Sequence, residues 1–290
     1  MNALKAIILI VCFGSNFFAS NAFSVAQHEA DSSRAIATPH FLYTPHLWLA
    51  TARALAASAS FETRSHWHAP LSGLVGTLQR WSYLRFDFGV ANNVKLQIRG
   101  AIQQQLRIDT QASSPSANIP FHGTTRDAGD FSIATIIRLY SSKQHQTAFG
   151  FRAETKLPNT TQSKGLGPNT TDIYLSVLAS HRIRALLLFS DVGIGILTAP
   201  RELDVQNDVL SYGLGGSIAA GERWIFAAEL NGFLTTRNVI PLGTEARGVA
   251  RAGGSYACDA FQIEAAFMHG LTQNEGTWGA SIGITKAIRF

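Results

Sequence analysis

Charged and amide side chains alternate with apolar ones along residues 94–108, a pattern that could line a water-filled passage. Lys95, Arg99 and Arg107 fall on one face of this alternation, while Leu96 and Ile98 fall on the other. A period of two residues is that of a β-strand with one face in water and one face in apolar surroundings. A row of cations on the wet face could attract and steer anions.

The same alternation places more charged residues on the polar faces of other segments, and we expect all of these faces to point into one lumen. The lumen-lining candidates are Arg85, Asp87, Lys95, Arg99, Arg107, Arg138, Arg152, Glu154, Lys156, Asp172, Asp191, Glu229, Arg247, Arg251 and Glu264. Positive charge predominates among them. Two interpretations remain open: the charges pair across neighbouring strands and hold the barrel shut, since buried unpaired charges are strongly disfavoured, or they line a conducting path.

Catalytic and metal sites are not expected. His269 faces outward near the end of its strand, as a lipid hydrolase in an outer membrane would require, but Ser255 and Ser281 on the flanking strands fall on the opposite face. The two imidazoles of His66 and His68 lie on one side of an extended segment that we interpret as an aqueous loop, and two ligands without a third do not make a metal site. We therefore predict no catalytic residue, no metal and no cofactor.

A series of strands must position these side chains. We predict strands over 55–65, 78–90, 94–108, 129–141, 146–157, 170–181, 184–198, 207–219, 222–235, 244–257, 260–273 and 277–290. The connections alternate between tight turns and mostly longer loops, which is the layout of outer-membrane barrels. The fold class we predict is all-β, a transmembrane antiparallel β-barrel of about 12 strands.

The amino-terminal residues predict the compartment. Residues 1–22 read as a cleaved signal peptide, with Lys5 before an apolar run and small residues at the cleavage point. Residues 23–54 are expected to be a periplasmic lead-in segment, with insertion into the lumen as a small plug as the alternative. Residues 55–290 are assigned to the barrel.

Composition excludes several other classes. Hydrophobic residues make up 46% and charged residues 15% of the chain, and no mature segment approaches a membrane-spanning helix. A soluble β-sandwich would be long for one continuous series of strands. The net charge of +5 suggests a basic surface or lumen, but no cluster of basic residues with interleaved aromatics indicates nucleic acid.

The last predicted strand ends on an aromatic residue. Trp278, Ile282, Ile284 and Ile288 alternate with small or polar residues, and Phe290 closes the series. This end resembles the last strand of bacterial outer-membrane barrels, where it is read by the assembly machinery. We therefore expect Phe290 to be an assembly signal, the partners to be outer-membrane lipid and the barrel assembly machinery, and the location to be the cell outer membrane.

Three motifs support a resemblance to a known family. Gly129-Asp130 opens one strand, Lys156-Leu157-Pro158 closes the next, and residues 165–172 (GLGPNTTD) lead into another. This order resembles the outer-membrane β-barrel family of meta-pathway of phenol degradation transporter-like proteins, mainly over residues 78–197. The resemblance implies a barrel that passes small, often hydrophobic or aromatic compounds, and it implies no catalytic residues.

The function we predict is a channel or transporter for a small-molecule substrate in the outer membrane. A closed structural or interaction barrel without transport is the first alternative. An outer-membrane lipid hydrolase is the second.

Overall fold

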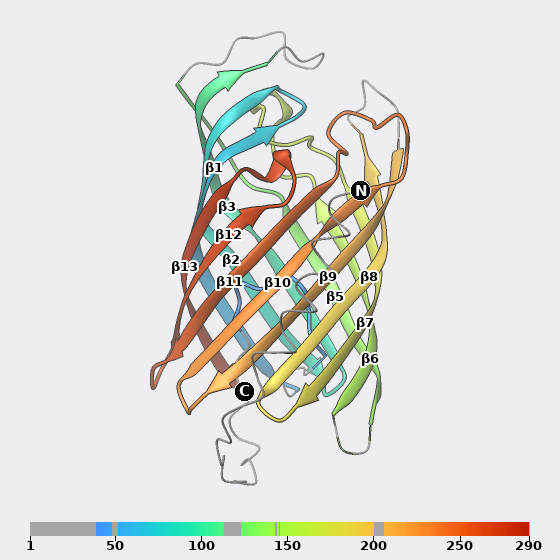
Figure 1. Cartoon of the computed structure of the whole chain (residues 1–290), viewed down its shortest axis with the longest axis vertical. Coiled ribbons are helices and arrows are strands. Elements are labelled where there is room, and N and C mark those ends of the chain that lie inside the picture. Colours follow the sequence, from blue (N-terminus) through green and yellow to red (C-terminus); the bar gives the residue numbers. More distant parts are fainter. Residues whose placement is uncertain are drawn as a thin grey trace, which may run out of the picture. The chain divides into compact units, whose positions relative to one another are not determined.

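The structure is a computed structural model that describes residues 39–47, 52–112, 123–142, 144, 146–199 and 206–289. In this part of the chain thirteen strands form one sheet. Twelve of them close into an antiparallel barrel (Figure 1), because β1 pairs with β2 on one side and with β13 on the other. The twelve are β1 (Ala54–Ala69), β2 (Leu74–Ala91), β3 (Val94–Gln111), β5 (Phe131–Ser141), β6 (Thr147–Leu157), β7 (Asp172–Ile183), β8 (Leu186–Thr198), β9 (Gln206–Ala220), β10 (Trp224–Thr235), β11 (Arg247–Ala257), β12 (Gln262–Gly270) and β13 (Trp278–Arg289). The remaining strand, β4 (Thr124–Asp127), pairs only with the end of β3. The predicted fold class is confirmed.

Two ends of the barrel differ in the length of their connections. The turn between β2 and β3 is Asn92-Asn93, that between β7 and β8 is Arg184-Ala185, and these tight turns share one end with the start of β1 and the end of β13. We call this end the short-turn end. The longer connections, including the short 3-10 turns η1 (Gln162–Lys164) and η3 (Gln273–Glu275), lie at the opposite, long-loop end (Figure 1).

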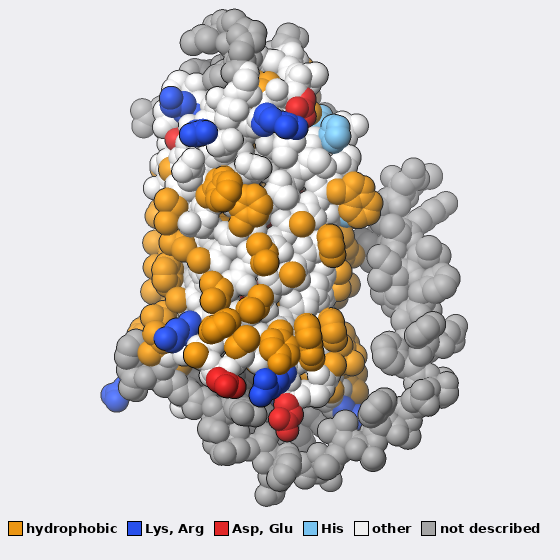
Figure 2. Space-filling model, turned by 90° about the vertical axis from the view of Figure 1, so that its left-hand side faces the viewer, with side chains coloured by type: hydrophobic (Ala, Val, Ile, Leu, Met, Phe, Trp, Pro, Cys, Tyr) orange, Lys and Arg blue, Asp and Glu red, His pale blue; other side chains and the backbone are white. Residues whose placement is uncertain are grey.

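Large apolar side chains cover the outward face of the barrel. The exposed fraction is 63% for Val177, 55% for Val192 and 75% for Phe267. Along each of these strands, exposed residues alternate with buried ones. Figure 2 shows such side chains gathered over the middle of one side, with charged side chains toward both ends. An apolar band of this extent is unfavourable in water and matches the lipid-facing band of transmembrane barrels. The outer surface therefore suits a bilayer.

The inward and outward faces of β3 exchange partway along the strand. Ile102 and Gln103 are both exposed, and beyond them Leu106 is fully buried while Arg107 is exposed. β2 makes the matching change beside them, where Ser82 adopts a left-handed backbone conformation with a φ of 51°, so the two strands stay paired while both turn over. The prediction that Arg107 lines the lumen is therefore wrong.

An apolar cluster occupies the inward face beyond this exchange. Trp67, Leu74, Leu78, Leu106 and Leu166 pack together near the long-loop end. Trp67 is only 4% exposed because β1 runs to Ala69, past the predicted end of that strand at residue 65. The segment from His66 to His68 thus lies in a strand, and our interpretation of it as an aqueous loop is wrong.

Residues 39–47, which we call the plug segment, lie inside the barrel. Leu42 is 2% exposed and Leu47 is fully buried against side chains of the barrel wall. We expected these residues in a periplasmic lead-in, and the structure instead agrees for them with the plug alternative. A barrel of twelve strands is wider than the eight-stranded kind that side chains alone can fill, so there is room for an added segment.

Several predictions concern residues outside the described part of the chain. These are the signal peptide at residues 1–22, most of the remaining lead-in, and Phe290. Among the described residues, no helix is long and apolar enough to cross a bilayer.

Candidate functional site

The plug segment is surrounded by buried ion pairs, of which the first group centres on Asp87. Its carboxylate accepts hydrogen bonds from Arg85 at 2.9 Å, from Lys95 at 3.2 Å and from Gln97 at 2.8 Å. All four side chains are buried. They meet because β2 and β3 are in a register that places Asp87 opposite Gln97. Each charge in this group has a partner, as a buried charge requires.

A second group joins β3, β6 and β8. Arg99 donates to Glu154 at 3.0 Å, and Arg152 binds the same carboxylate as well as Asp191, the latter at 3.5 Å. Glu154 is thus shared by two guanidinium groups from two strands. The ion pair between Arg99 and Glu154 crosses the intervening strand β5. It therefore helps to hold this wall of the barrel together.

A third group lies where the wall meets the long loops. Lys156 binds Asp172 at 2.7 Å and Asp130 at 3.4 Å. Asp172 also accepts the backbone amide of Thr198 at 3.1 Å, and Asp130 accepts that of Thr160 at 3.0 Å. Asp172 therefore links the start of β7 to the end of β8, and Asp130 binds the backbone of the loop after β6.

Near the long-loop end, a further group includes residues that the sequence analysis did not select. Glu62 binds Arg64 at 2.6 Å and Arg80 at 3.0 Å, and Arg64 also binds Glu275. Arg247 binds Glu275 at 3.1 Å. Burial of Glu275 raises the pKa of its carboxyl, but Arg64 and Arg247 lower it more, so the pKa lies below its ordinary value.

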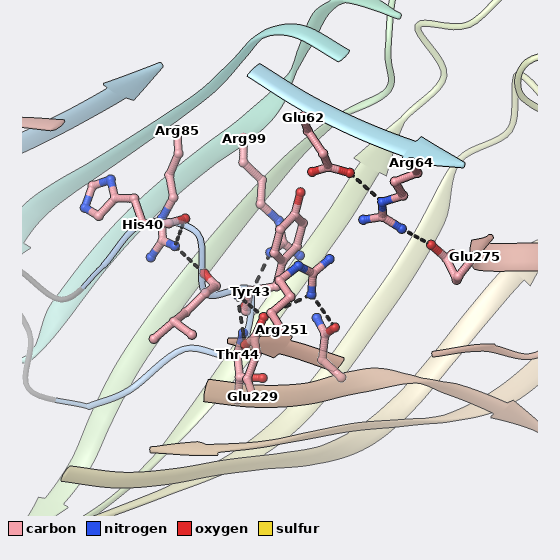
Figure 3. A network of polar contacts seen from close by, with 12 residues as sticks. His40, Tyr43, Thr44, Glu62, Arg64, Arg85, Arg99, Glu229, Arg251 and Glu275 are labelled. Carbon is pink, nitrogen blue, oxygen red and sulfur yellow. Dashed lines mark hydrogen bonds and ion pairs between the residues drawn. The ribbon is translucent and has the colours of Figure 1, made fainter. Parts of the chain in front are cut away.

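Two carboxylates of the wall hold the backbone of the plug segment. Glu229 accepts the amides of Tyr43 and Thr44, each at 2.8 Å (Figure 3). Glu264 accepts those of His40 and Phe41 at 2.7 and 3.1 Å. Carboxylate-to-amide hydrogen bonds are charge-assisted and stronger than neutral ones. The plug segment is therefore anchored by its main chain.

Arginines of the wall hold the carbonyl groups of the same segment. Arg85 donates to the carbonyl oxygen of Leu42 at 2.6 Å, Arg99 to that of Tyr43 at 3.3 Å and Arg138 to that of Leu47 at 3.4 Å. These three were predicted to line the lumen, and here their partners include backbone atoms of the plug segment.

The ring of Tyr43 lies among cations and another ring. The Arg251 guanidinium is 4.0 Å and the Arg99 guanidinium 4.8 Å from the ring centroid, and the Tyr83 ring lies at 5.6 Å. Arg251 also binds Glu229 at 3.0 Å, so the carboxylate that holds the Tyr43 amide also holds a cation over its ring. Cations over aromatic faces stabilise by about 2 kcal/mol or more when water is excluded.

The side chains of the plug segment fit shaped spaces in the wall. Phe41 and Leu42 pack on Leu187, Phe189 and Ala266, near the short-turn end, and Leu47 enters a second apolar site. Two wall glycines make room: an added Cβ would lie 2.6 Å from the Thr44 hydroxyl at Gly213 and 2.6 Å from the Leu47 side chain at Gly150. Alternation along the sequence does not indicate these contacts, since they join residues far apart in the chain.

Both ends of the plug segment are held near the short-turn end. Glu264, which holds His40 and Phe41, is the third residue of β12, and Ser180, which accepts the amide of Leu47 at 3.0 Å, is close to the end of β7. Tyr43 reaches farther into the lumen, where it meets Arg99 and Arg251. The two described ends of the segment thus lie toward the short-turn end, and Tyr43 between them lies farthest from it.

Some polar atoms of the plug segment are buried without a hydrogen-bond partner among the described residues. They are Nδ1 of His40 and of His46, the hydroxyl of Tyr43 and Oγ1 of Thr44. Burial, together with the charges of Arg85 and Lys95, lowers the pKa of both histidines to about 3, so both are neutral at pH 7. An unsatisfied buried group costs about 1–3 kcal/mol, which offsets part of the anchoring described above.

A cavity of about 230 Å³ lies between the tip of the plug segment and the long-loop end. Its lining includes Tyr43 from the plug segment and Arg99, Lys156, Asn231 and Phe233 from the barrel wall. Most of the lining residues carry a charged, amide or hydroxyl group. The cavity is thus suited to a small polar molecule.

The lumen-lining candidates other than Arg107 divide by burial. Arg85, Asp87, Lys95, Arg152, Glu154, Asp172, Asp191, Glu229, Arg251 and Glu264 are buried, and Arg99, Arg138, Lys156 and Arg247 are partly buried. The structure brings most of them into the groups above. Alternation along one strand predicts that Arg85 and Asp87 share a face and can pair. A pair such as Arg99 and Glu154 depends on the register of three strands, which alternation does not give.

The structure places His269, the candidate for lipid hydrolysis, and Ser255 of the flanking strand on opposite faces of the barrel wall. The His269 ring packs on Trp278 with 4.4 Å between centroids, whereas Ser255 is 2% exposed on the inward face. No group of three or more metal-ligating side chains occurs in the described part of the chain.

Comparison with solved structures identifies outer-membrane barrels of the same fold. The COG4313 outer membrane channel from Pseudomonas putida F1 superposes with a TM-score of 0.61 at 13% identity, over 84% of this chain and 99% of that one. The NanC porin superposes with a TM-score of 0.51 at 10% identity, over 81% of this chain and 99% of that one. No protein-family model and no curated protein matches the sequence. The shared feature is the outer-membrane barrel fold.

Proposed function

We propose that this protein is an outer-membrane channel for small molecules and that residues 39–47 close it. The observation that carries the proposal is the plug segment itself, whose backbone is held by Glu229 and Glu264 in the middle of a closed barrel. The lumen of a twelve-stranded barrel is too wide for wall side chains alone to fill, so without this segment it would offer a path. A separate segment whose described ends both lie toward one end of the barrel can be withdrawn without breaking any pairing between strands.

The contacts of the plug segment suit a reversible closure. They are hydrogen bonds, ion–ring contacts and packing, and the buried polar atoms that lack partners in the described residues weaken the closed state. When the segment leaves, Arg251 keeps its bond to Glu229 and Arg85 keeps its bond to Asp87. These two ion pairs therefore persist in the open channel.

The cavity lining supports a polar substrate. The family resemblance implies hydrophobic or aromatic compounds, for which Phe233 and the tyrosine rings offer the apolar part of the lining. The charged and hydroxyl groups around these rings would be desolvated without compensation by a wholly apolar molecule. We therefore favour small molecules that carry at least one polar or charged group.

Conductance of the refolded protein in a planar bilayer tests this proposal. A variant in which residues 39–47 are replaced by Gly and Ser residues of equal number is expected to conduct steadily, whereas the unaltered mature chain conducts rarely or in brief openings. Heat-modifiable migration on unboiled gels verifies that both proteins have folded into complete barrels. A folded variant that never conducts contradicts the proposal.

A closed structural or interaction barrel is the second candidate. The nearly complete pairing of inward charges favours it, because paired residues on adjacent strands stabilise the wall. In that case the variant without the plug segment stays silent and is less stable. The same experiment thus separates the two functions.

A further inference from the structure

Two cations and a hydroxyl form one row across three strands beside the cavity. Arg99 on β3 pairs with Ser132 on β5, and Ser132 pairs with Lys156 on β6. Adjacent strands are about 4.8 Å apart, so the Cα atoms of the two cations are separated by about 10 Å. The small side chain of Ser132 leaves space between them, and all three residues line the cavity.

The positive ends of this row are more accessible than the carboxylates that pair with them. The Arg99 side chain is 15% exposed and that of Glu154 is 5%, while the values are 19% for Lys156 and 7% for Asp172. The charged residues that line the cavity are Arg99, Arg152, Lys156, Glu154 and Asp191, and the two carboxylates that bind Lys156, those of Asp172 and Asp130, lie outside the lining. A surface with low-dielectric walls and accessible cations favours an anion.

The opposite side of the cavity differs in character. Phe233 and Asn231 of β10 face the cationic row across the space, and the ring of Tyr174 lies beside it. About 230 Å³ corresponds to roughly eight water molecules and is smaller than most sites for drug-sized ligands. The occupant must therefore be small, with a hydrocarbon part no larger than about one ring.

We propose that this cavity binds a small organic carboxylate, held between Arg99 and Lys156 above the Ser132 hydroxyl with its hydrocarbon part against Phe233. This inference rests on the proposed channel function and assigns that channel a substrate class. It requires no movement of the plug segment, since the cavity exists with the segment in place.

The site is coupled to the plug segment through Arg99. The same guanidinium group donates to the carbonyl oxygen of Tyr43 at 3.3 Å and lies over the Tyr43 ring. A carboxylate that binds Arg99 competes for these contacts and weakens the closed state. Binding of the substrate thus favours opening.

Calorimetric titration of the full mature protein in detergent tests the site with three compounds of the same shape. Benzoate carries a negative charge, benzamide none and benzamidine a positive charge. We expect benzoate to bind at least tenfold more tightly than benzamide and benzamidine to give no signal. Equal affinity for benzoate and benzamide, or no binding of any of the three, overturns the inference, and this result depends on no variant.

Variants of the row locate the binding. Lys156→Gln should weaken benzoate at least fivefold and Lys156→Arg should restore most of the affinity, whereas Arg107→Gln, on the outward face of β3, should change nothing. Unchanged affinity for benzoate in a folded Lys156→Gln protein excludes the proposed binding site. Calorimetry does not require conduction, so the two proposals can fail separately. Benzoate binding by a barrel that never conducts would contradict the proposed channel but support the binding site. Conduction without benzoate binding would support the channel and contradict the binding site.

Discussion

Arg251 lies 4.0 Å from the centroid of the Tyr43 ring and joins the barrel wall to the tip of the plug segment. The guanidinium is itself fixed by Glu229 at 3.0 Å and by Asn231 at 2.6 Å. Because Glu229 also accepts the amides of Tyr43 and Thr44, one carboxylate sets both the main chain and the ring of the tip. Glu229 is therefore the residue on which seating of the plug segment should depend most.

Replacing Glu229 with Gln should release the plug segment. The neutral amide loses the charge assistance to two backbone donors and leaves Arg251 without its carboxylate, a loss of about 1.5–3 kcal/mol, or roughly ten- to hundredfold in the seating equilibrium. Maleimide labelling of a Thr44→Cys protein in a Cys258→Ser background measures the change. Glu222→Gln, at the exposed turn between β9 and β10, is the matched control, and equal labelling of the two would exclude the anchoring role.

Filling the space at Gly213 should displace the same segment by a steric route. In Gly213→Ala the added Cβ meets Thr44 at 2.6 Å, whereas in Gly216→Ala on the same strand it meets outward-facing Leu188 at 3.2 Å. We expect the first variant to conduct more often than the unaltered protein and the second to behave like it. If both barrels are heat-modifiable and equally silent, the tip can shift without opening a path.

Acid should weaken seating of the plug segment. His40 and His46 have a pKa of about 3 when seated, against about 6.5 when released into water, so the seated state binds fewer protons. The contribution of the two neutral histidines to the stability of the seated state is complete above pH 6.5 and is lost progressively as the pH falls toward 3. Because the thiolate is the reacting form and becomes scarcer in acid, labelling of Thr44→Cys is divided by that of the unfolded protein at the same pH, and this ratio should rise between pH 6 and pH 4.

The groups around these histidines determine how the acid test is controlled. Arg85, Lys95 and Asp87 act on both rings, and Arg182 acts on His46. His46→Gln should flatten the response between pH 6 and pH 4, while His181→Gln, at the exposed end of β7, should keep it. A response that survives in the double variant His40→Gln/His46→Gln would exclude the two histidines as its origin.

Removal of Phe290 should lower insertion into the outer membrane. This prediction rests on the sequence of the last strand, whose outward residues Trp278, Ile282 and Ile284 are exposed toward the bilayer. The measurement is the heat-modifiable fraction in outer-membrane preparations from cells. Phe267→Ala, which removes an outward ring from the neighbouring strand β12, controls for loss of apolar area, and equal insertion of both variants would remove the signal role.

The sequence predicts the barrel well because alternation is a local property. Every strand of the ring was expected, and Lys95 and Asp87 lie on the face that the period assigns to them. Arg107 was misplaced because one left-handed residue on a different strand, Ser82, accompanies the exchange of faces. Neither period nor charge marks that position.

The candidate site was less predictable for a related reason. The plug segment has no alternation, and it is held by Glu229 and Glu264, which lie 186 and 224 residues away from Tyr43 and His40. Such contacts depend on closure of the whole ring. The glycines at 150 and 213 mark the fit only after the segment has been placed.

Leu47 and Ala54 are separated by seven steps of the chain, which sets how far a withdrawn tip can travel. A fully extended chain covers about 3.3–3.6 Å per residue, so Leu47 remains within about 25 Å of the first residue of β1. A short tether of this kind gives an effective concentration in the millimolar range. Reclosure is therefore intramolecular, and the mean duration of an opening should not depend on how densely the barrels are packed in the membrane.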